Sequence, residues 1–249
     1  IKELPIDKIL EGIKVRDLSR VEDRSLYFCP VMDSVVLPTH PFYPNASPVS
    51  ANIPMVIGNT RRETRAFLGR IPGVNELTWE QLPKLIEVSQ FVDIRAEVVI
   101  EEYRKMYPNY SPTEVFFAST TAGRSWRGAI IEAEERAKQI GAATYTYQLD
   151  WSRASHALDI SLVFDNTKIR PASDNVEKDK QMAEIMCETL LAFAKTGNPN
   201  NVKIPQWKPY SMENRETMIF DLPTRMENDP RGGERKLYSR VPFTERGTY

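Results

Sequence analysis

His156 is the side chain best placed for acid-base chemistry in this chain of 249 residues, which contains two histidines. It follows residues 143–149, a run of β-branched and aromatic side chains that predicts a strand. A residue just past the C-terminal end of such a strand lies at the rim where α/β sheets bind ligands. We therefore interpret His156 as a general base, although a lone histidine before an apolar segment is more often structural. His40, in the proline-bounded loop 37–42, lacks this setting and is interpreted as structural.

An acidic partner for His156 lies upstream, behind a second predicted strand. Residues 53–60 form a short apolar run that leads into a turn, and Glu63 follows that turn. Both side chains would then lie at the same rim of the sheet. An acid that precedes the histidine in the chain matches the order of the Ser, Asp/Glu and His triad of α/β-hydrolases, in which the nucleophilic serine comes first. The serine is thus expected before Glu63.

These two segments, together with others along the chain, resemble the type-B carboxylesterase and cholinesterase family. The matching motifs are Phe28-Cys-Pro30-Val31-Met-Asp33 with Leu37-Pro38, residues 53–63, residues 151–164, Ala194-Lys-Thr-Gly197-Asn-Pro199, Trp207-x-Pro209-Tyr210 and Asn228-Asp-Pro-Arg231. They follow the family's order over nearly the whole chain. The resemblance implies an α/β-hydrolase fold, with a mostly parallel central sheet flanked by helices, and it is closest to bacterial-type general carboxylesterases.

The nucleophile of that family is missing from the sequence. The chain has no Gly-x-Ser-x-Gly elbow and no glycine-rich segment that could form an oxyanion hole. Ser125, within residues 123–128, has a spacing that is wrong by one residue, and the apolar period after it predicts a serine at the start of a helix that ends at Gly141. We therefore expect residues 1–249 to be the C-terminal portion of a single α/β-hydrolase domain, with the elbow and the oxyanion hole outside this chain.

The resemblance implies a serine-dependent carboxylic ester hydrolase that works through an acyl-enzyme. Glu63 and His156 would be the acid and base of its Ser-Glu-His triad, and Asp159 is a candidate for a supporting role behind the histidine. No cofactor and no metal ion is expected. The expected partners are a small ester substrate and the N-terminal part of the same domain or a companion chain.

Several side chains bear on the choice of substrate. Ala66 stands three residues after the acid, where cholinesterases carry an aromatic residue that helps to hold choline, so a choline ester is not expected. Phe42, Tyr43 and Phe67 are candidates for an apolar acyl or alcohol pocket, although aromatic residues in such segments are as often core residues. Carbamates and activated amides are alternative substrates, because the same acyl-transfer machinery handles them.

The residues around the acid and the base depart from the family. Arg62 and Thr64 flank the acid where Asp and Gly are common, and Ala157 and Asp159 follow the histidine where Gly and Glu are common. One alternative class is a cholinesterase-like binding module that has lost catalysis, and the intact acid and base argue against it. Another is a separate fragment or subunit that is active only beside its N-terminal complement.

The composition is that of an ordinary globular protein, with 41% apolar and 27% charged residues. The net charge of -1 comes from well-mixed acids and bases, so neither nucleic acid nor an anionic membrane is expected as a partner. No stretch has the length of a transmembrane helix. Cys29 and Cys187 do not suggest a disulfide framework, which favours a cytoplasmic protein. Secretion stays open, because we expect the true N-terminus not to be in view.

A largely helical insertion is predicted at residues 75–140, between the acid and the strand at 143–149. Thr78-x-x-Gln81 resembles a capping box, a helical period covers residues 93–106, and residues 111–114 combine an N-cap serine, an N1 proline and an N3 acid. The insertion is interpreted either as part of a lid over the site or as plain packing.

Two further patterns indicate packing alone. A later helix has apolar residues at 182, 185, 186, 190 and 193 and is expected to stop at Gly197. Tyr145 and Tyr147 alternate along a predicted strand and are expected in the core.

Overall fold

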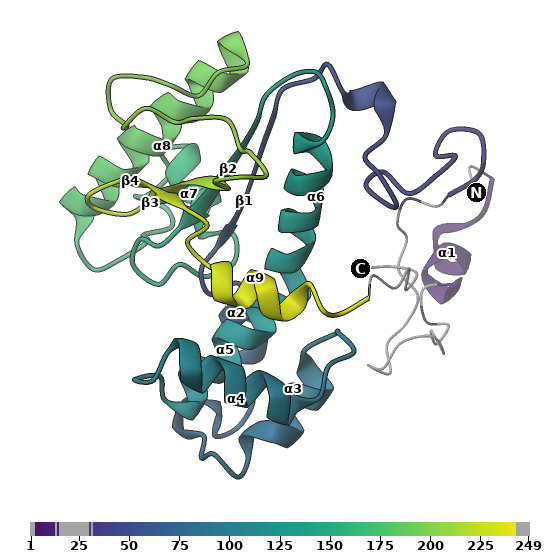
Figure 1. Ribbon diagram of the computed structural model, residues 1–249, viewed down its shortest axis with the longest axis vertical. Helices are drawn as coiled ribbons and strands as arrows, with labels where there is room; N and C mark the ends of the chain where they lie inside the picture. The colour runs from purple at the N-terminus through teal and green to yellow at the C-terminus, as the bar shows by residue number, and fades with distance from the viewer. Residues whose placement is uncertain (1–2, 13, 15–29, 31, 243–249) are drawn as a thin grey trace.

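The structure, a computed structural model, describes residues 3–12, 14, 30 and 32–242 (Figure 1). A four-stranded sheet lies at its centre, in the order β1-β2-β3-β4. The strands are β1 (Met55–Thr60), β2 (Thr144–Leu149), β3 (Glu216–Phe220) and β4 (Arg225–Asn228). The first three are parallel, and β4 runs antiparallel to β3. The two predicted strands and the mostly parallel sheet are thus confirmed.

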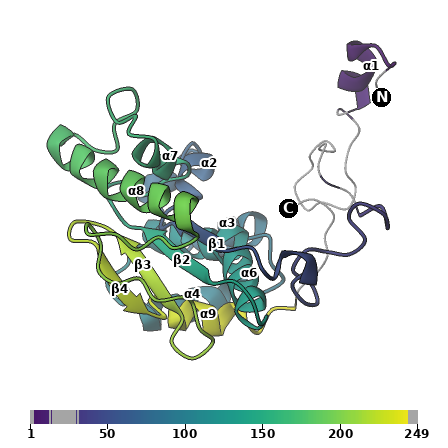
Figure 2. The same ribbon diagram turned by 90° about the horizontal axis from the view of Figure 1, so that it is seen from above.

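Helices cover the sheet (Figure 2). In chain order they are α1 (Ile6–Gly12), α2 (Arg65–Leu68), α3 (Leu82–Ser89), α4 (Ala96–Met106), α5 (Pro112–Thr121), α6 (Arg127–Ala137), α7 (Leu158–Val163), α8 (Val176–Thr196) and α9 (Gly232–Tyr238), with 3-10 turns at Pro48–Ser50 and Val74–Glu76. α8 lies on one side of the sheet and α6 on the other, whereas α1 lies apart from it (Figure 2). None of the helices in the described part of the chain has the length and apolar character needed to cross a membrane. Phe28, Cys29 and Val31 of the motif at 28–33 lie outside the described residues.

The two faces of β2 carry different side chains. Tyr145 and Leu149 are buried in an apolar core that includes Met182 of α8. Thr146 and Gln148 alternate with them and line a small space on the side of α6. The core position predicted for Tyr145 is therefore confirmed. α8 ends at Gly197, as predicted, with φ of 73° in the left-handed region that glycine adopts without strain.

The helices of the predicted insertion bury a core of their own, because α3, α4 and α5 pack on one another and on α9. The capping box at the start of α5 is confirmed: the Glu114 amide donates to Ser111 Oγ at 3.3 Å, and the Ser111 amide donates to Glu114 Oε2 at 2.8 Å. At the earlier box only the Thr78 amide bond to Gln81 forms, and α3 begins at Leu82. A lid role for the insertion stays a prediction.

α5 continues without a break into α6 through a π-helical turn, Ala122–Trp126 (Figure 1). Ser125 lies inside this turn, and its hydroxyl donates to the Thr121 carbonyl at 3.1 Å. The helix start predicted at Ser125 is therefore wrong. A serine can satisfy its hydroxyl on the carbonyl four residues earlier, so a serine inside a helix is compatible with the same local pattern. The joined helix leads from the insertion to the sheet.

A buried ion pair holds α9 against the insertion. Arg231 Nε donates to Glu234 Oε1 at 2.9 Å, and its guanidinium lies 4.2 Å from the centre of the Trp126 ring. Tyr103 of α4 and Tyr107, which follows the end of α4, donate to the two carboxylate oxygens at 2.6 and 2.8 Å. Burial by itself raises the pKa of Glu234, but the arginine and the tyrosine hydroxyls outweigh it and lower the pKa below its ordinary value. The carboxylate thus stays ionised inside the fold.

Gly58 lets β1 approach the ring of Tyr147 closely, since a Cβ at this position would lie 2.4 to 2.5 Å from its ring atoms. We expect Gly58→Ala to lower the free energy of unfolding by about 1–3 kcal/mol, as overpacking does, in urea denaturation. Gly128→Ala is the control, because a Cβ there meets nothing within 4 Å. Alanine in place of this helical glycine should raise the free energy of unfolding by about 0.5–1 kcal/mol. Equal stability of the two variants would contradict the close approach.

Candidate active site

Glu63 and His156 meet at the C-terminal ends of β1 and β2. The two strands are parallel and in register, with Thr60 opposite Leu149 at the ends that carry these loops. His156 Nδ1 lies 2.7 Å from Glu63 Oε2, although the residues are 93 positions apart. The structure therefore brings together the acid and the base that the sequence singled out.

Backbone hydrogen bonds continue the parallel ladder beyond the strands. The Arg61 amide donates to the Leu149 carbonyl at 3.0 Å, and the Arg62 amide donates to the Ala154 carbonyl at 2.8 Å. Arg62 also pairs with Ser155 in an isolated parallel bridge. The loop that carries the acid is thus fastened to the loop that carries the histidine.

Each oxygen of the Glu63 carboxylate has a partner. Oε1 accepts a hydrogen bond from the Thr60 amide at 3.0 Å, and Oε2 faces His156. The Glu63 side chain is 12% exposed and that of His156 is 52% exposed. His156 Nε2 has no hydrogen-bond partner among the residues that the structure describes. A ring held through Nδ1 with Nε2 free can accept a proton and return it.

The loop that carries His156, residues 150–157, is called the histidine loop below, and its backbone is strained. Ser152, Ala154 and Ala157 have φ values of 57°, 42° and 61°, in the left-handed region that is costly for residues with a Cβ. Ala157 stands where glycine is common in the family that the sequence resembles. The loop therefore needs strong anchors elsewhere to hold this shape.

Asp179, at the start of α8, provides one such anchor. Its carboxylate accepts hydrogen bonds from Trp151 Nε1 at 2.9 Å and from the amides of Ala172 and Ser173 at 2.7 and 2.8 Å. Burial by itself raises the pKa of Asp179, but the bonds from Ser173, Trp151 and Ala172 outweigh it and lower the pKa below its ordinary value. The sequence analysis missed this residue, whose only local signal is an acid in the first turn of a helix.

Phe67 is the aromatic candidate that lies beside the base. Its exposed ring is tilted against that of His156, with the ring centres 4.7 Å apart. Asp159 instead accepts a hydrogen bond from the Tyr147 hydroxyl at 2.8 Å. Burial, followed by the charges of Asp159 and Glu63, raises the pKa of Tyr147, so this hydroxyl stays protonated and donates. A supporting role of Asp159 behind the histidine stays a prediction.

Phe42 and Tyr43 lie away from the acid-base pair. Phe42 lines a cleft against α6, and the residues lining that cleft include neither Glu63 nor His156. Tyr43 is exposed, and its ring meets that of His40 edge-on. Their loop and the α2 and α7 region lie on opposite sides of α6 (Figures 1 and 2). A pocket role would require the substrate site to extend across α6.

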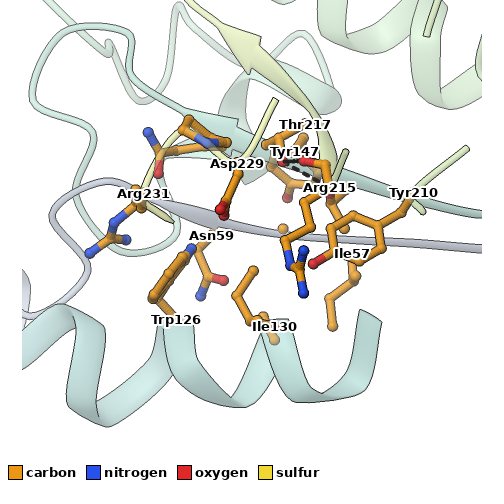
Figure 3. Close-up of a pocket in the computed structure, with 15 residues that line it drawn as sticks. Ile57, Asn59, Trp126, Ile130, Tyr147, Tyr210, Arg215, Thr217, Asp229 and Arg231 are labelled. Carbon is orange, nitrogen blue, oxygen red and sulfur yellow. Dashed lines mark hydrogen bonds between the residues drawn. The ribbon is translucent and has the colours of Figure 1, made fainter. Parts of the chain in front are cut away.

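A small cavity lies between the sheet and α6, lined in part by Trp126, Ile130, Tyr210 and Arg215 (Figure 3). Its volume of about 20 Å³ gives room for roughly one water molecule. It is therefore no pocket for an ester, and the acid-base pair does not line it.

A family comparison matches residues 1–237 to the carboxylesterase family. The chain belongs to that family. A para-nitrobenzyl esterase of Bacillus subtilis is 27% identical over 256 residues, which cover 95% of this chain and 50% of the relative. A solved carboxylesterase of Geobacillus stearothermophilus gives a TM-score of 0.69 at 28% identity, over 85% of this chain and 45% of that one. A solved PNB esterase gives 0.65 at 26% identity, over 92% and 47%.

The fold class follows from these likenesses. The carboxylesterase-family chain has the mostly parallel, helix-flanked sheet of the α/β-hydrolases, as its sequence predicts. It spans about half the length of the relatives named above.

The lowered pKa of Asp179 predicts how the free energy of unfolding changes at acid pH. Because its folded pKa is lowered, it contributes stability above its unfolded pKa of about 3.9 and loses that contribution as the pH falls through the folded value. We expect Asp179→Asn to be less stable than the native chain at pH 7, and its stability to fall less steeply below about pH 4. Urea denaturation across this range measures both effects. Asp174→Asn, an exposed change in the loop that leads into α8, should follow the native curve, and three parallel curves would contradict the role of Asp179.

Proposed function

We propose that this chain is the acid- and base-bearing part of a serine-dependent carboxylic ester hydrolase that works through an acyl-enzyme. The observation that carries the proposal is the 2.7 Å contact between Glu63 Oε2 and His156 Nδ1, with Nε2 unbonded in the part of the chain that the structure describes. The names of the Bacillus and Geobacillus relatives, an esterase and a carboxylesterase, support ester hydrolysis. Residues 1–249 would be the C-terminal portion of one domain, whose other portion supplies the elbow and the oxyanion hole.

In this mechanism His156 Nε2 removes the proton of the serine hydroxyl while the serine oxygen attacks the ester carbonyl carbon. The electron pair of the carbonyl moves to its oxygen, where backbone amides stabilise the negative charge. The ester C–O bond then breaks, and His156 gives its proton to the departing alkoxide. Water repeats the cycle on the acyl-enzyme and releases the carboxylic acid. Glu63 orients the ring through Nδ1 and stabilises its charged form.

The proposal requires a partner for this chain, either the N-terminal part of the same domain or a companion chain. The sequence has no Gly-x-Ser-x-Gly elbow. Among the described residues, β1 is paired with β2 on one side only. An unpaired strand edge presents free backbone groups to which a further strand can bond. This edge is where we expect the other half of the sheet to continue.

Two residues near the pair bear on the substrate. The exposed ring of Phe67 beside His156 favours an ester with an apolar or aromatic group. Ala66 offers no aromatic face to a quaternary ammonium group, which disfavours choline esters. Carbamates and activated amides would use the same chemistry.

A fluorophosphonate probe, which labels activated serines, tests the function directly. We expect intact-mass analysis of the full-length protein to show one adduct, and peptide mapping to place it on a serine outside residues 1–249. No adduct on a confirmed full-length chain would favour the inactive binding module. No adduct on this chain alone is the expected result, because the elbow is absent from its sequence.

Substitutions of the pair test the roles of the acid and the base. In the full-length enzyme we expect His156→Ala to lower kcat by about 10⁴- to 10⁶-fold and Glu63→Gln by about 10⁴-fold, as in other serine hydrolase triads. The matched control is His40→Ala, because this histidine accepts the Phe42 amide within its own loop and lines a cleft that includes neither Glu63 nor His156. Near-normal turnover of His156→Ala would show that the assignment is wrong.

A further inference from the structure

Three buried threonines join the loop that carries Glu63 to α5. This loop, residues 61–64, is called the acid loop below. The Thr64 hydroxyl lies 2.8 Å from Thr120 Oγ1, 3.0 Å from Thr121 Oγ1 and 3.2 Å from the Phe117 carbonyl oxygen. The Thr64 amide also donates to Thr121 Oγ1 at 3.2 Å. All three threonines are buried. Thr64, Thr120 and Thr121 are called the threonine cluster below.

The hydroxyls of the threonine cluster can all be satisfied by one another and by the Phe116 carbonyl. Thr120 donates its hydroxyl proton to the Phe116 carbonyl at 2.7 Å, so its oxygen is available to accept from Thr64. Thr121 can then donate to the Thr64 oxygen while it accepts the Thr64 amide. Loss of the Thr64 hydroxyl would leave buried hydroxyls on α5 short of a partner, which is more costly than the loss of an exposed hydrogen bond.

Glu63 lies between two anchored neighbours. Arg62, before it, is bonded to the histidine loop, and Thr64, after it, is bonded to α5. Thr64 stands at the N-cap position of α2, but its side chain makes no capping hydrogen bond there. Its hydroxyl therefore serves the contact with α5 and not the start of α2.

We propose that the threonine cluster positions Glu63 against His156, which makes α5 part of the support of the acid. Thr64 stands where glycine is common in the family. Because glycine has no hydroxyl, these hydrogen bonds depend on the residues of this chain. α5 belongs to the helical insertion and runs on into α6. The insertion is thus tied to the acid through hydrogen bonds. The effect on turnover rests on the proposed function, whereas the effect on the Glu63–His156 contact does not.

The first test measures hydrolysis of a p-nitrophenyl ester by the full-length enzyme. Thr64→Val puts a methyl group in place of the hydroxyl, Thr64→Gly installs the residue common in the family, and Thr64→Ser keeps the hydroxyl. We expect the first two to lower kcat about 10- to 100-fold with little change in KM, because a displaced acid orients the base poorly. Thr64→Ser should stay within about threefold of the native kcat.

A matched control separates positioning from general loss of stability. Thr146 makes another buried hydroxyl contact, 3.1 Å from Thr217 Oγ1 within the sheet. Thr146→Val removes a buried hydroxyl without touching the acid loop, so it should lower thermal stability and leave kcat within about threefold. An equal loss of kcat in Thr146→Val and Thr64→Val would overturn the proposal.

Histidine NMR gives a readout that does not need activity. In the ¹⁵N-histidine-labelled full-length protein, the signal of His156, assigned by its loss in His156→Gln, should show a proton on Nδ1 shared with Glu63. We expect this signal to persist in Thr64→Ser and Thr146→Val and to shift or broaden in Thr64→Val and Thr64→Gly. An unchanged signal in the last two variants would overturn the proposal. If the native protein has no esterase activity, the proposed function fails, and this comparison alone decides the role of the threonine cluster.

Discussion

The parallel pairing of β1 with β2 is the constraint on which the candidate site depends. Side chains alternate along a strand, so a slip of one residue would turn Tyr145 from the α8 side of the sheet to the α6 side. The same slip would separate Glu63 from His156, whose loops follow the paired ends of the two strands. Gly58 leaves room for the ring of Tyr147, its partner on β2. The register of the sheet and the contact between acid and base are therefore set by the same interactions.

Hydrogen bonds add to apolar packing in stabilising the loops beyond that pairing. The histidine loop contains residues with positive φ, which cost about 1–3 kcal/mol each when they are not glycine. Asp179 offsets part of this cost with bonds to Trp151 and to the chain at 172–173. On α9, the buried carboxylate of Glu234 is likewise kept charged by Arg231 and two tyrosine hydroxyls. Buried charges of this kind stabilise a fold only while every partner stays in place, so they define a single arrangement of the loops and helices around the sheet.

Local sequence signals predicted the parts of the fold whose physics is local. Two strand-like runs placed Glu63 and His156 at one rim, and the capping box at Ser111 marked the start of α5. Ser125 misled the prediction, because its hydroxyl is satisfied inside a continuous helix by the same short-range geometry. Thr64 was noticed only as a departure from the family, since its partner Thr121 is 57 positions away. The position of Phe42 relative to α6 depends on the path of the chain between elements, and no short motif encodes that path.

The distribution of burial around the acid-base pair supports an enzyme over a binding module. This chain encloses the carboxylate of Glu63 and leaves the ring of His156 half exposed, with the exposed ring of Phe67 beside it. A buried carboxylate costs free energy unless it is bonded, and a strained loop costs more. A surface used only for binding would be more stable with glycine in place of Ala157. It would also be more stable if well-packed apolar residues replaced Glu63 and His156. The oriented base gives these costs a function if it receives a proton from a nucleophile on its open side. The second half of the domain would bring that nucleophile to this rim of the sheet.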